Sequence, residues 1–257
     1  MKDIQNQKDL RKIPINKVGI EDLVYPIRVM DRANVLQHTI AKVKLSVELP
    51  HHFRGTHMSR FVEVLNKHSN NITIQNIEGI LDELKKALRA EKSYLELEFS
   101  YFIKKKAPVS RLESYMNYTC KFIASKAETF DFILEVDVPV HTLCPCSKEI
   151  SERGAHNQRA EISIQVRTSK LVWIEELVEI AEESASSPLF ALLKRPDEKL
   201  VTEKAFDTPR FVEDVVREVA LRLNREPRIF WFKINVKSFE SIHNHNAFAC
   251  VEVDKRH

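Results

Sequence analysis

The segment Phe132-Ile-Leu-Glu-Val-Asp-Val-Pro-Val140 alternates apolar and polar side chains over most of its length, which is typical of a half-buried β-strand. A second alternating segment, Ala160-Glu-Ile-Ser-Ile-Gln-Val166, follows it, and segments 228–236 and 247–253 close the chain in the same way. Between these pairs, apolar residues recur at helical spacing over 171–184 and 209–224. The order predicts a ββααββ module.

The N-terminal half shows a similar order. An alternating strand is expected over 39–49, helices over 58–68 and 77–92, and strands over 94–104 and 111–125. We therefore expect an irregular lead-in over 1–36, a first module over 37–130 and a second over 131–257. Antiparallel hairpins with helices gathered on one face indicate the α+β class.

Composition limits the classes of function. The chain has 257 residues, of which 30% are charged, and its net charge of +3 is modest and scattered, so we expect no nucleic-acid partner, although local basic patches could hold phosphates. No apolar run reaches the roughly 18 residues of a membrane span, so we expect no membrane partner. Four cysteines and an N-terminus without an apolar leader predict the reducing cytoplasm.

Glycine is scarce, with four residues in the whole chain. Phosphate-binding loops of the Walker or dinucleotide type need clustered glycines, so neither can be present. If the protein binds a nucleotide, side chains must hold its phosphates, and arginine, lysine, histidine and serine suit that task.

The segment Cys144-Pro-Cys146 is followed by His156, and thiolate with imidazole is a donor set that zinc prefers. A closed structural zinc site takes four protein ligands, and no second cysteine pair is present. An incomplete site leaves room for a water molecule, whose pKa falls to about 7 on a metal. The pattern favours a hydrolase-like metal centre.

Two other segments could supply the remaining ligands. His243 and His245 lie two residues apart, and Asp197–Lys204 carries carboxylates. Residues two apart in an extended segment share a face, so each close pair could point one way. Two neighbouring thiolates chelate one ion only with strain, so we expect either Cys144 or Cys146 to be the ligand and the other to lie beside it.

Three strings together resemble the prokaryotic type IB GTP cyclohydrolase I family. They are Arg54-Gly-Thr-His57-Met-Ser59-Arg60-Phe61, then Cys144-Pro-Cys146-Ser-Lys148 with Gly154-Ala-His156-Asn-Gln-Arg159, and finally Glu240-Ser-Ile-His243-Asn-His245-Asn-Ala247. The resemblance implies a tunnelling fold (T-fold) with two tandem ββααββ modules, assembled as a homotetramer with active sites at subunit interfaces. It also implies that GTP and water become 7,8-dihydroneopterin triphosphate and formate, the first step of tetrahydrofolate biosynthesis.

The resemblance assigns chemistry to individual residues. A divalent metal, Zn²⁺ or Mn²⁺ with Fe²⁺ as a further possibility, would bind Cys144, His156 and Glu198, with His243 completing the set. Water activated by this metal would attack C8 of guanine, while His243 or His245 transfers protons. The predicted catalytic residues are Cys144, Cys146, His156, His243 and His245.

The same resemblance predicts how the substrate is held. Glu213 would anchor the purine, because one carboxylate can accept from a ring N–H and the exocyclic amine together; Glu203 is the substitute. The triphosphate would be held by Arg54, His57, Ser59, Arg60, Lys148 and Arg159. For Arg60 and Arg159 the other interpretation is an ordinary surface ion pair.

Two alternatives belong to different classes. The first is another T-fold enzyme, such as a 7-deazaguanine nitrile reductase, which needs NADPH and no metal. The second is a non-enzymatic metal- or RNA-binding module with a structural Cys/His cluster, whose RNA binding would fall steeply with salt.

Overall fold

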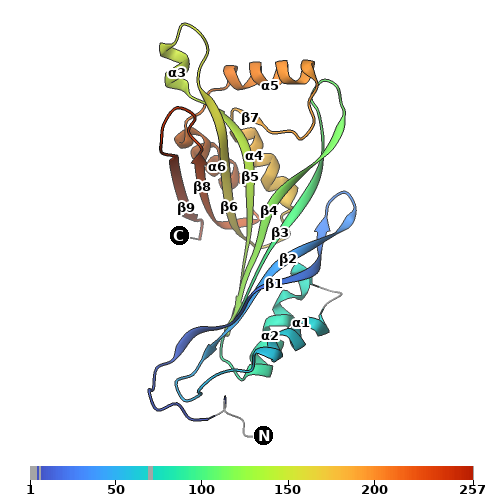
Figure 1. Cartoon of the computed structure of the whole chain (residues 1–257), viewed down its shortest axis with the longest axis vertical. Helices are drawn as coiled ribbons and strands as arrows, with labels where there is room; N and C mark the ends of the chain where they lie inside the picture. The colour runs from blue at the N-terminus through green and yellow to red at the C-terminus, as the bar shows by residue number, and fades with distance from the viewer. Residues whose placement is uncertain (1–4, 6, 69–71, 257) are drawn as a thin grey trace. The chain divides into compact units, whose positions relative to one another are not determined.

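The computed structural model describes residues 5, 7–68 and 72–256. The chain forms two compact units. Unit 1 comprises Met1–Ser100 with Lys121–Leu134, and unit 2 comprises Tyr101–Cys120 with Glu135–His257. Both units combine antiparallel strands with helices (Figure 1), which confirms the α+β class.

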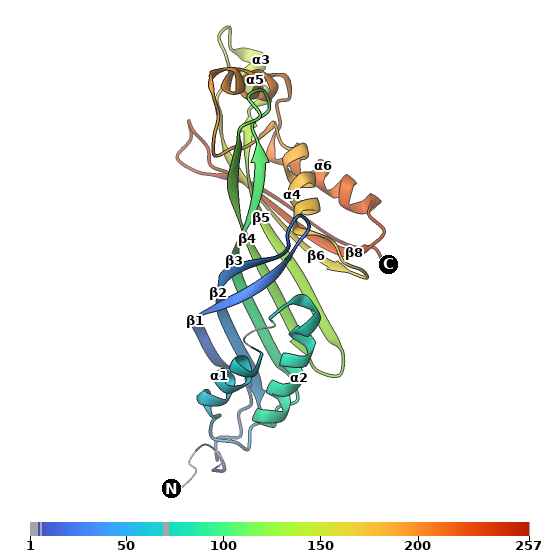
Figure 2. The same cartoon turned by 90° about the vertical axis from the view of Figure 1, so that its right-hand side faces the viewer.

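Unit 1 is built from long antiparallel strands with two helices packed beside them (Figure 2). Its elements are β1 (Ile15–Asp31), β2 (Val35–Leu49), α1 (Met58–Lys67), the short 3₁₀ helix η1 (Ile74–Asn76), α2 (Ile77–Leu88) and parts of β3 (Ser93–Lys106), β4 (Glu113–Lys126) and β5 (Phe130–Leu143). The strands are ordered β1-β2-β3-β4-β5. The predicted helices and strands of this half are confirmed with small shifts at their ends.

Strand β1 corrects the expected lead-in over 1–36. Residues 15–31 are not irregular but pair antiparallel with β2, with register shifts between Ile15 and Val18 and between Ile20 and Leu23. Each irregularity moves later side chains to the other face, so the strand loses the two-residue period. Pro26 is tolerated because β1 lies at the end of the strand order, where a missing N–H breaks no central ladder. Residues 1–4 and 6 of the expected lead-in lie outside the described residues.

Unit 2 carries the remaining elements. They are the other parts of β3, β4 and β5, then α3 (Pro145–Ile150), β6 (Asn157–Thr168), α4 (Ile174–Ser184), β7 (Ser187–Pro188), α5 (Arg195–Asp207), α6 (Val212–Arg225), β8 (Ile229–Ser238) and β9 (Ala247–Asp254). The strands are ordered β3-β4-β5-β6-β8-β9, and β7 pairs with β5. The predicted strands and the helices over 171–184 and 209–224 are confirmed, whereas α3 and α5 were not anticipated.

The apolar face of α6 packs against the sheet. Val215, Val219 and Leu223, spaced four residues apart, are fully buried, and α6 packs beside α4 and on β8 and β9. Phe232 and Ile234 of β8 are equally buried. Burying a side chain of this size contributes roughly 1.5–3 kcal/mol, so these contacts hold α6 against the sheet.

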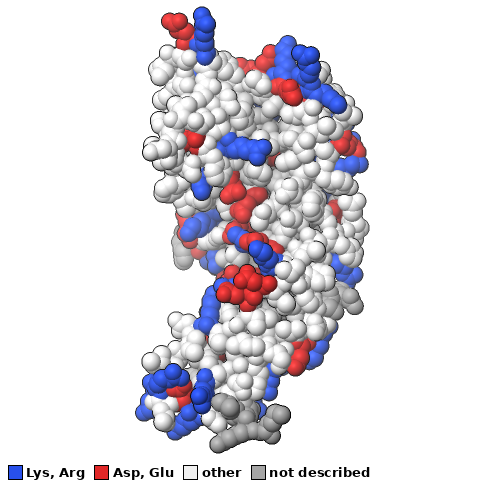
Figure 3. Space-filling view, in the orientation of Figure 1, with Lys and Arg blue, Asp and Glu red and all other residues white. Residues whose placement is uncertain are grey.

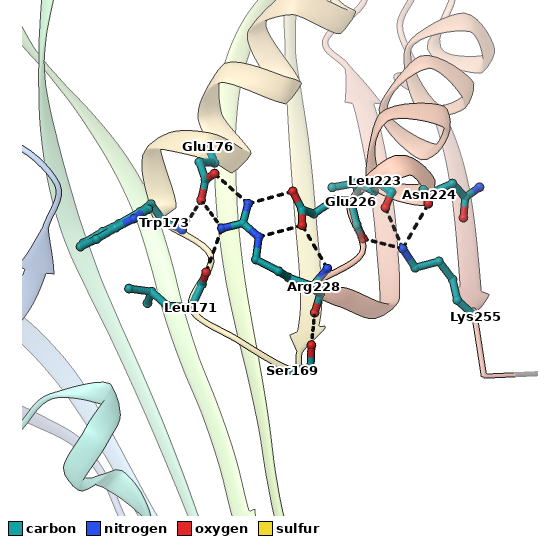
Figure 4. Close-up of polar contacts among 9 residues, drawn as sticks. All are labelled: Ser169, Leu171, Trp173, Glu176, Leu223, Asn224, Glu226, Arg228 and Lys255. Carbon is teal, nitrogen blue, oxygen red and sulfur yellow. Dashed lines mark hydrogen bonds and ion pairs between the residues drawn. The ribbon is translucent and has the colours of Figure 1, made fainter.

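Arg228, just before β8, links the first turn of α4 to the residue that follows α6 (Figure 4). Its Nη2 lies 2.8 Å from Oε1 of Glu176, its Nε lies 2.7 Å from Oε1 of Glu226, and its Nη1 donates to the carbonyl of Leu171. The hydrogen bonds from Arg228 hold the pKa of Glu226 at about 2. Lys255 donates to the carbonyls of Leu223 and Glu226 and so caps the C-terminal end of α6.

The first half runs β1 β2 α1 η1 α2 β3 β4, whereas in the second half α3, β7 and α5 interrupt the expected ββααββ order. The division into modules over 37–130 and 131–257 stays a prediction. Within the described residues, no helix is long and apolar enough to cross a membrane. On the face drawn in Figure 3, acidic and basic side chains are intermixed, in line with the small net charge.

Candidate active site

One cavity in unit 2 gathers most of the predicted catalytic residues. It has a volume of about 280 Å³ and lies among the end of β5, the start of α6 and the connection between β8 and β9. Its lining residues are Thr142, Cys144, His156, Gln158, Arg210, Phe211, Val212, Glu213, Ser238, Glu240, His243, His245 and Ala247. A thiol, three imidazoles and two carboxylates therefore face a common space.

The loop between β5 and β6 holds Cys144 and His156 together. The backbone N–H of Cys144 donates to the carbonyl of His156 at 3.1 Å, and the N–H of His156 donates to Oγ of Ser147 at 3.1 Å. The thiol of Cys144 caps α3 by accepting from the N–H of Ser147. Gly154 turns the loop back with φ of +76°, a conformation that other residues adopt only with strain.

Gln158 sets the orientation of the His156 ring. Nδ1 of His156 lies 2.9 Å from Oε1 of Gln158, and Nε2 of Gln158 donates to Oγ1 of Thr142. Because an amide oxygen only accepts, Nδ1 of His156 is the protonated nitrogen of the neutral ring. Nε2 then carries the lone pair that a metal ion or a proton can use.

The connection between β8 and β9 brings two further imidazoles to the cavity. The rings of His243 and His245 stack with centroids 5.1 Å apart, and the ring of His243 meets His156 edge-on at 6.3 Å. Both side chains belong to exposed residues, so protons can exchange between these rings and solvent. His156, His243 and His245 therefore line one space, and their roles in metal binding and proton transfer stay predictions.

The two cysteines of the CxC segment have different surroundings. Cys144 is half-buried and lines the cavity, whereas Cys146 is exposed on α3 and is not among the lining residues. This difference supports Cys144 as the ligand, and the assignment stays a prediction. Cys120 is buried and Cys250 is exposed. None of the four cysteines forms a disulfide.

The start of α6 contributes Glu213, and the segment just before it contributes Arg210, which the sequence did not single out. Glu213 is an exposed residue that lines the cavity, whereas Glu203 is exposed on α5 and is not among the lining residues. The role of either glutamate as purine anchor stays a prediction. Arg210 also lines the cavity, and its backbone N–H donates to the carbonyl of Leu143 at 3.0 Å. No motif pointed to Arg210, because only the packing of α6 brings it beside the end of β5. Gln158 and Glu240 lay within the quoted strings without an assigned role.

Glu198, the predicted carboxylate ligand, is exposed on α5 and is not among the lining residues. Its neighbour Asp197 is buried and fixes the start of α5. The Asp197 carboxylate accepts from the N–H groups of Val109, Ser110 and Lys194 at 2.7–2.9 Å. Burial opposes the charge, but these hydrogen bonds hold the pKa of Asp197 well below its usual range. Ligation by Glu198 stays a prediction.

The predicted phosphate-binding residues fall in both units. Arg54, His57, Ser59 and Arg60 belong to unit 1, where Nη1 of Arg60 donates to the carbonyl of Ala87. In unit 2, the ammonium of Lys148 donates to the carbonyl of Phe206 and lies 4.2 Å from that ring, and Arg159 is exposed. None of the six lines the cavity. Their role with phosphate stays a prediction.

The donor chemistry of the cavity fits a divalent transition metal. A thiol with two or more imidazoles suits zinc and iron, and the orientation of His156 leaves one ring nitrogen available. Within residues 5, 7–68 and 72–256, no three His, Cys, Asp or Glu side chains are close enough to hold an ion together. Cys144, His156 and His243 thus line one cavity, but their side chains lie too far apart in this conformation to bind one ion together.

Comparison with known proteins decides the family. A family model described as type I GTP cyclohydrolase FolE2 matches residues 1–249. The chain belongs to this family. A Kosmotoga olearia protein named GTP cyclohydrolase FolE2 is 58% identical over 99% of both chains. A Geobacter sulfurreducens protein of the same name is 56% identical over 100% of this chain and 99% of its own.

Solved structures share the fold. A highly active mutant of urate oxidase from Bacillus sp. TB-90 superimposes with a TM-score of 0.55 at 12% identity, covering 93% of this chain and 100% of that one. Another urate oxidase structure from the same source has a TM-score of 0.54 at 12% identity, covering 94% and 100%. At this identity the likeness concerns the fold alone, and urate oxidases are T-fold proteins, so this FolE2-family chain has a urate-oxidase-like fold.

Proposed function

We propose that this protein is a metal-dependent GTP cyclohydrolase I that converts GTP and water to 7,8-dihydroneopterin triphosphate and formate. The observation that carries the proposal is the single cavity lined by Cys144, His156, His243, His245 and Glu213. Membership of the FolE2 family supports the same reaction. The cavity contains the side-chain types that the proposed reaction needs, namely a thiol, imidazoles and carboxylates.

Cys144 and His156 would hold a divalent metal, with His243 and Glu198 as further ligands. Such an ion supplies an activated water near neutral pH, because it lowers the pKa of water from 15.7 to about 7. Gln158 would keep Nε2 of His156 available, since it fixes the proton on Nδ1. Zn²⁺, Mn²⁺ and Fe²⁺ all suit these donors, and the affinity order does not choose between them.

Glu213 would orient the purine. A carboxylate accepts two hydrogen bonds in one plane, which matches the N1–H and the exocyclic amine of guanine. His243 and His245 would move protons to the ring nitrogen N7 and to the amine that leaves C8. Both rings line the cavity, and both belong to exposed residues that can exchange those protons with solvent.

The triphosphate would be bound by the basic residues predicted from the sequence. Lys148 and Arg159 lie in the chain segments that flank Cys144 and His156. Arg54, His57, Ser59 and Arg60 would complete the site in a homotetramer whose active sites lie at subunit interfaces. We propose the cytoplasm as its location, because four free thiols suit a reducing compartment.

The proposed function is tested by assaying the purified protein with GTP and added Zn²⁺ or Mn²⁺. Formate release and, after oxidation, pterin fluorescence are followed beside a chelator-treated sample. Both signals should arise with metal and vanish on chelation. Lack of product with every metal, together with NADPH-dependent reduction of a 7-deazaguanine nitrile, would replace the proposal with the nitrile reductase.

A further inference from the structure

The wall of the cavity contains two buried polar atoms that lack a partner. Among the described residues, neither Nε of Arg210 nor Oγ of Ser238 has a hydrogen-bond partner, and Ser238 is only 2% exposed. Both residues line the cavity. Buried polar groups in folded proteins are nearly always hydrogen-bonded to protein or water, so two unpaired ones in residues that line one cavity point to a polar partner there, a water molecule or a ligand.

The backbone around Arg210 is fixed in place. Its N–H donates to the carbonyl of Leu143, whose own N–H donates to Oγ of Ser186 at 3.1 Å. Arg210 is therefore held beside the end of β5, where its partner Leu143 directly precedes Cys144. Glu213, in the first turn of α6, lines the same cavity three residues later. A guanidinium and a carboxylate thus share this wall.

These two side chains offer complementary hydrogen-bonding groups. A carboxylate only accepts, whereas a guanidinium only donates. Guanine presents the same pattern in reverse, since its N1–H and exocyclic amine donate and the adjacent O6 accepts. Adenine places a donating amine where guanine has O6, so a guanidinium at that point disfavours adenine.

We propose that Arg210 is a specificity-determining residue that donates to O6 of guanine while Glu213 accepts from the neighbouring N–H groups. The inference rests on the proposed function and adds the residue that selects guanine by its oxygen. Oγ of Ser238, buried in the same cavity, is a further group available to the bound purine.

The test compares binding of guanosine with that of 6-thioguanosine, which keeps N1–H and the exocyclic amine but carries at position 6 a sulfur, a weaker acceptor than oxygen. Neither probe carries phosphate, so the comparison reports on the base alone. The wild-type protein should bind guanosine about three- to tenfold more tightly than 6-thioguanosine. Arg210→Ala should bring the two dissociation constants close to each other. Arg210→Lys, which keeps the charge without the planar fork, should give an intermediate ratio.

Arg217→Ala is the matched control, because Arg217 is an exposed arginine of α6 that does not line the cavity. Arg217→Ala should keep the wild-type ratio of the two dissociation constants. Thermal unfolding of each variant confirms that it is folded. The inference is overturned if Arg210→Ala keeps the preference for guanosine, or if it weakens GTP binding while guanosine binding is unchanged, which indicates a phosphate contact. A wild-type protein that binds neither guanosine nor GTP contradicts the proposed function itself.

Discussion

The backbone N–H of Cys144 donates to the carbonyl of His156 at 3.1 Å, so residues twelve positions apart in sequence meet at the mouth of the β5–β6 connection. This hydrogen bond fixes the spacing of the thiol and the imidazole that would bind the metal. The thirteen-residue segment from Cys144 to His156 can do this because α3 and Gly154 fold it back on itself.

Replacement of Cys144 should abolish turnover, whereas replacement of Cys146 should not. Cys144→Ala removes a thiol that lines the cavity, and we expect both bound metal and kcat/KM to fall more than about 100-fold. Cys146→Ala, at an exposed position of α3, is the matched control and should retain activity within about twofold of wild type. Metal analysis and GTP turnover measure both effects. Equal losses in the two variants would contradict the assignment.

Gln158 should affect metal affinity because it orients the His156 ring. Gln158→Leu removes the acceptor for Nδ1 of His156, and we expect metal affinity to fall by about 10–100-fold. Gln158→Glu keeps an acceptor and should recover most of the affinity. Asn157→Ala is the neighbouring control, because Asn157 contacts His141 instead. A metal titration of the purified variants provides the measurement, and unchanged affinity in Gln158→Leu would exclude the orienting role.

Glu213→Gln should weaken substrate recognition. The variant presents an amide where guanine needs a second accepting oxygen, and we expect kcat/KM for GTP to fall by roughly 10–100-fold. Most of the loss should appear in KM, because the carboxylate binds the purine away from C8. Glu203→Gln, at an exposed position of α5, tests the substitute candidate and should leave the kinetics unchanged. A loss confined to Glu203→Gln would transfer the role to that residue.

Arg228 should stabilise the fold without affecting catalysis. Arg228→Ala leaves Glu176 and Glu226 without their ion pair, and we expect unfolding free energy to fall by about 1–2 kcal/mol with an unaltered KM. Arg225→Ala, an exposed arginine at the end of α6, is the control.

Acid unfolding tests the same ion pair through Glu226, whose pKa is about 2 in the folded protein. An unfolded glutamate has a pKa of about 4.3, so the charged form stabilises the fold above that pH. The contribution is lost as pH falls from about 4.3 towards 2. The difference in unfolding free energy between wild type and Arg228→Ala should therefore shrink over that interval. A constant difference would contradict the linkage.

Much of the fold is readable from the sequence because apolar periodicity survives where an element has one buried face. Helix α6 is the clearest case, with Val215, Val219 and Leu223 at helical spacing. Strand β1 was missed because its two register shifts interrupt the alternation. Helix α5 was missed because only Asp197 and Ala205 are buried on it, which leaves no apolar period.

The site could be predicted where its residues are close in sequence and chemically unusual, as with Cys144, His156, His243 and His245. Arg210 could not be predicted, because an arginine before a helix is ordinary and only tertiary packing brings it to the cavity. The position of Glu198 could not be predicted from sequence patterns either. Helix α5 is held in place because Asp197 accepts hydrogen bonds from Val109 and Ser110, which are distant in sequence.

The most direct test of the central claim follows the fate of guanine C8. Purified protein loaded with Zn²⁺ or Mn²⁺ is incubated with GTP labelled with carbon-13 at C8, and the products are followed by NMR. The account predicts that the label leaves as formate, with the metal required and Cys144→Ala inactive. Label that stays in an intact purine ring under every metal would contradict it.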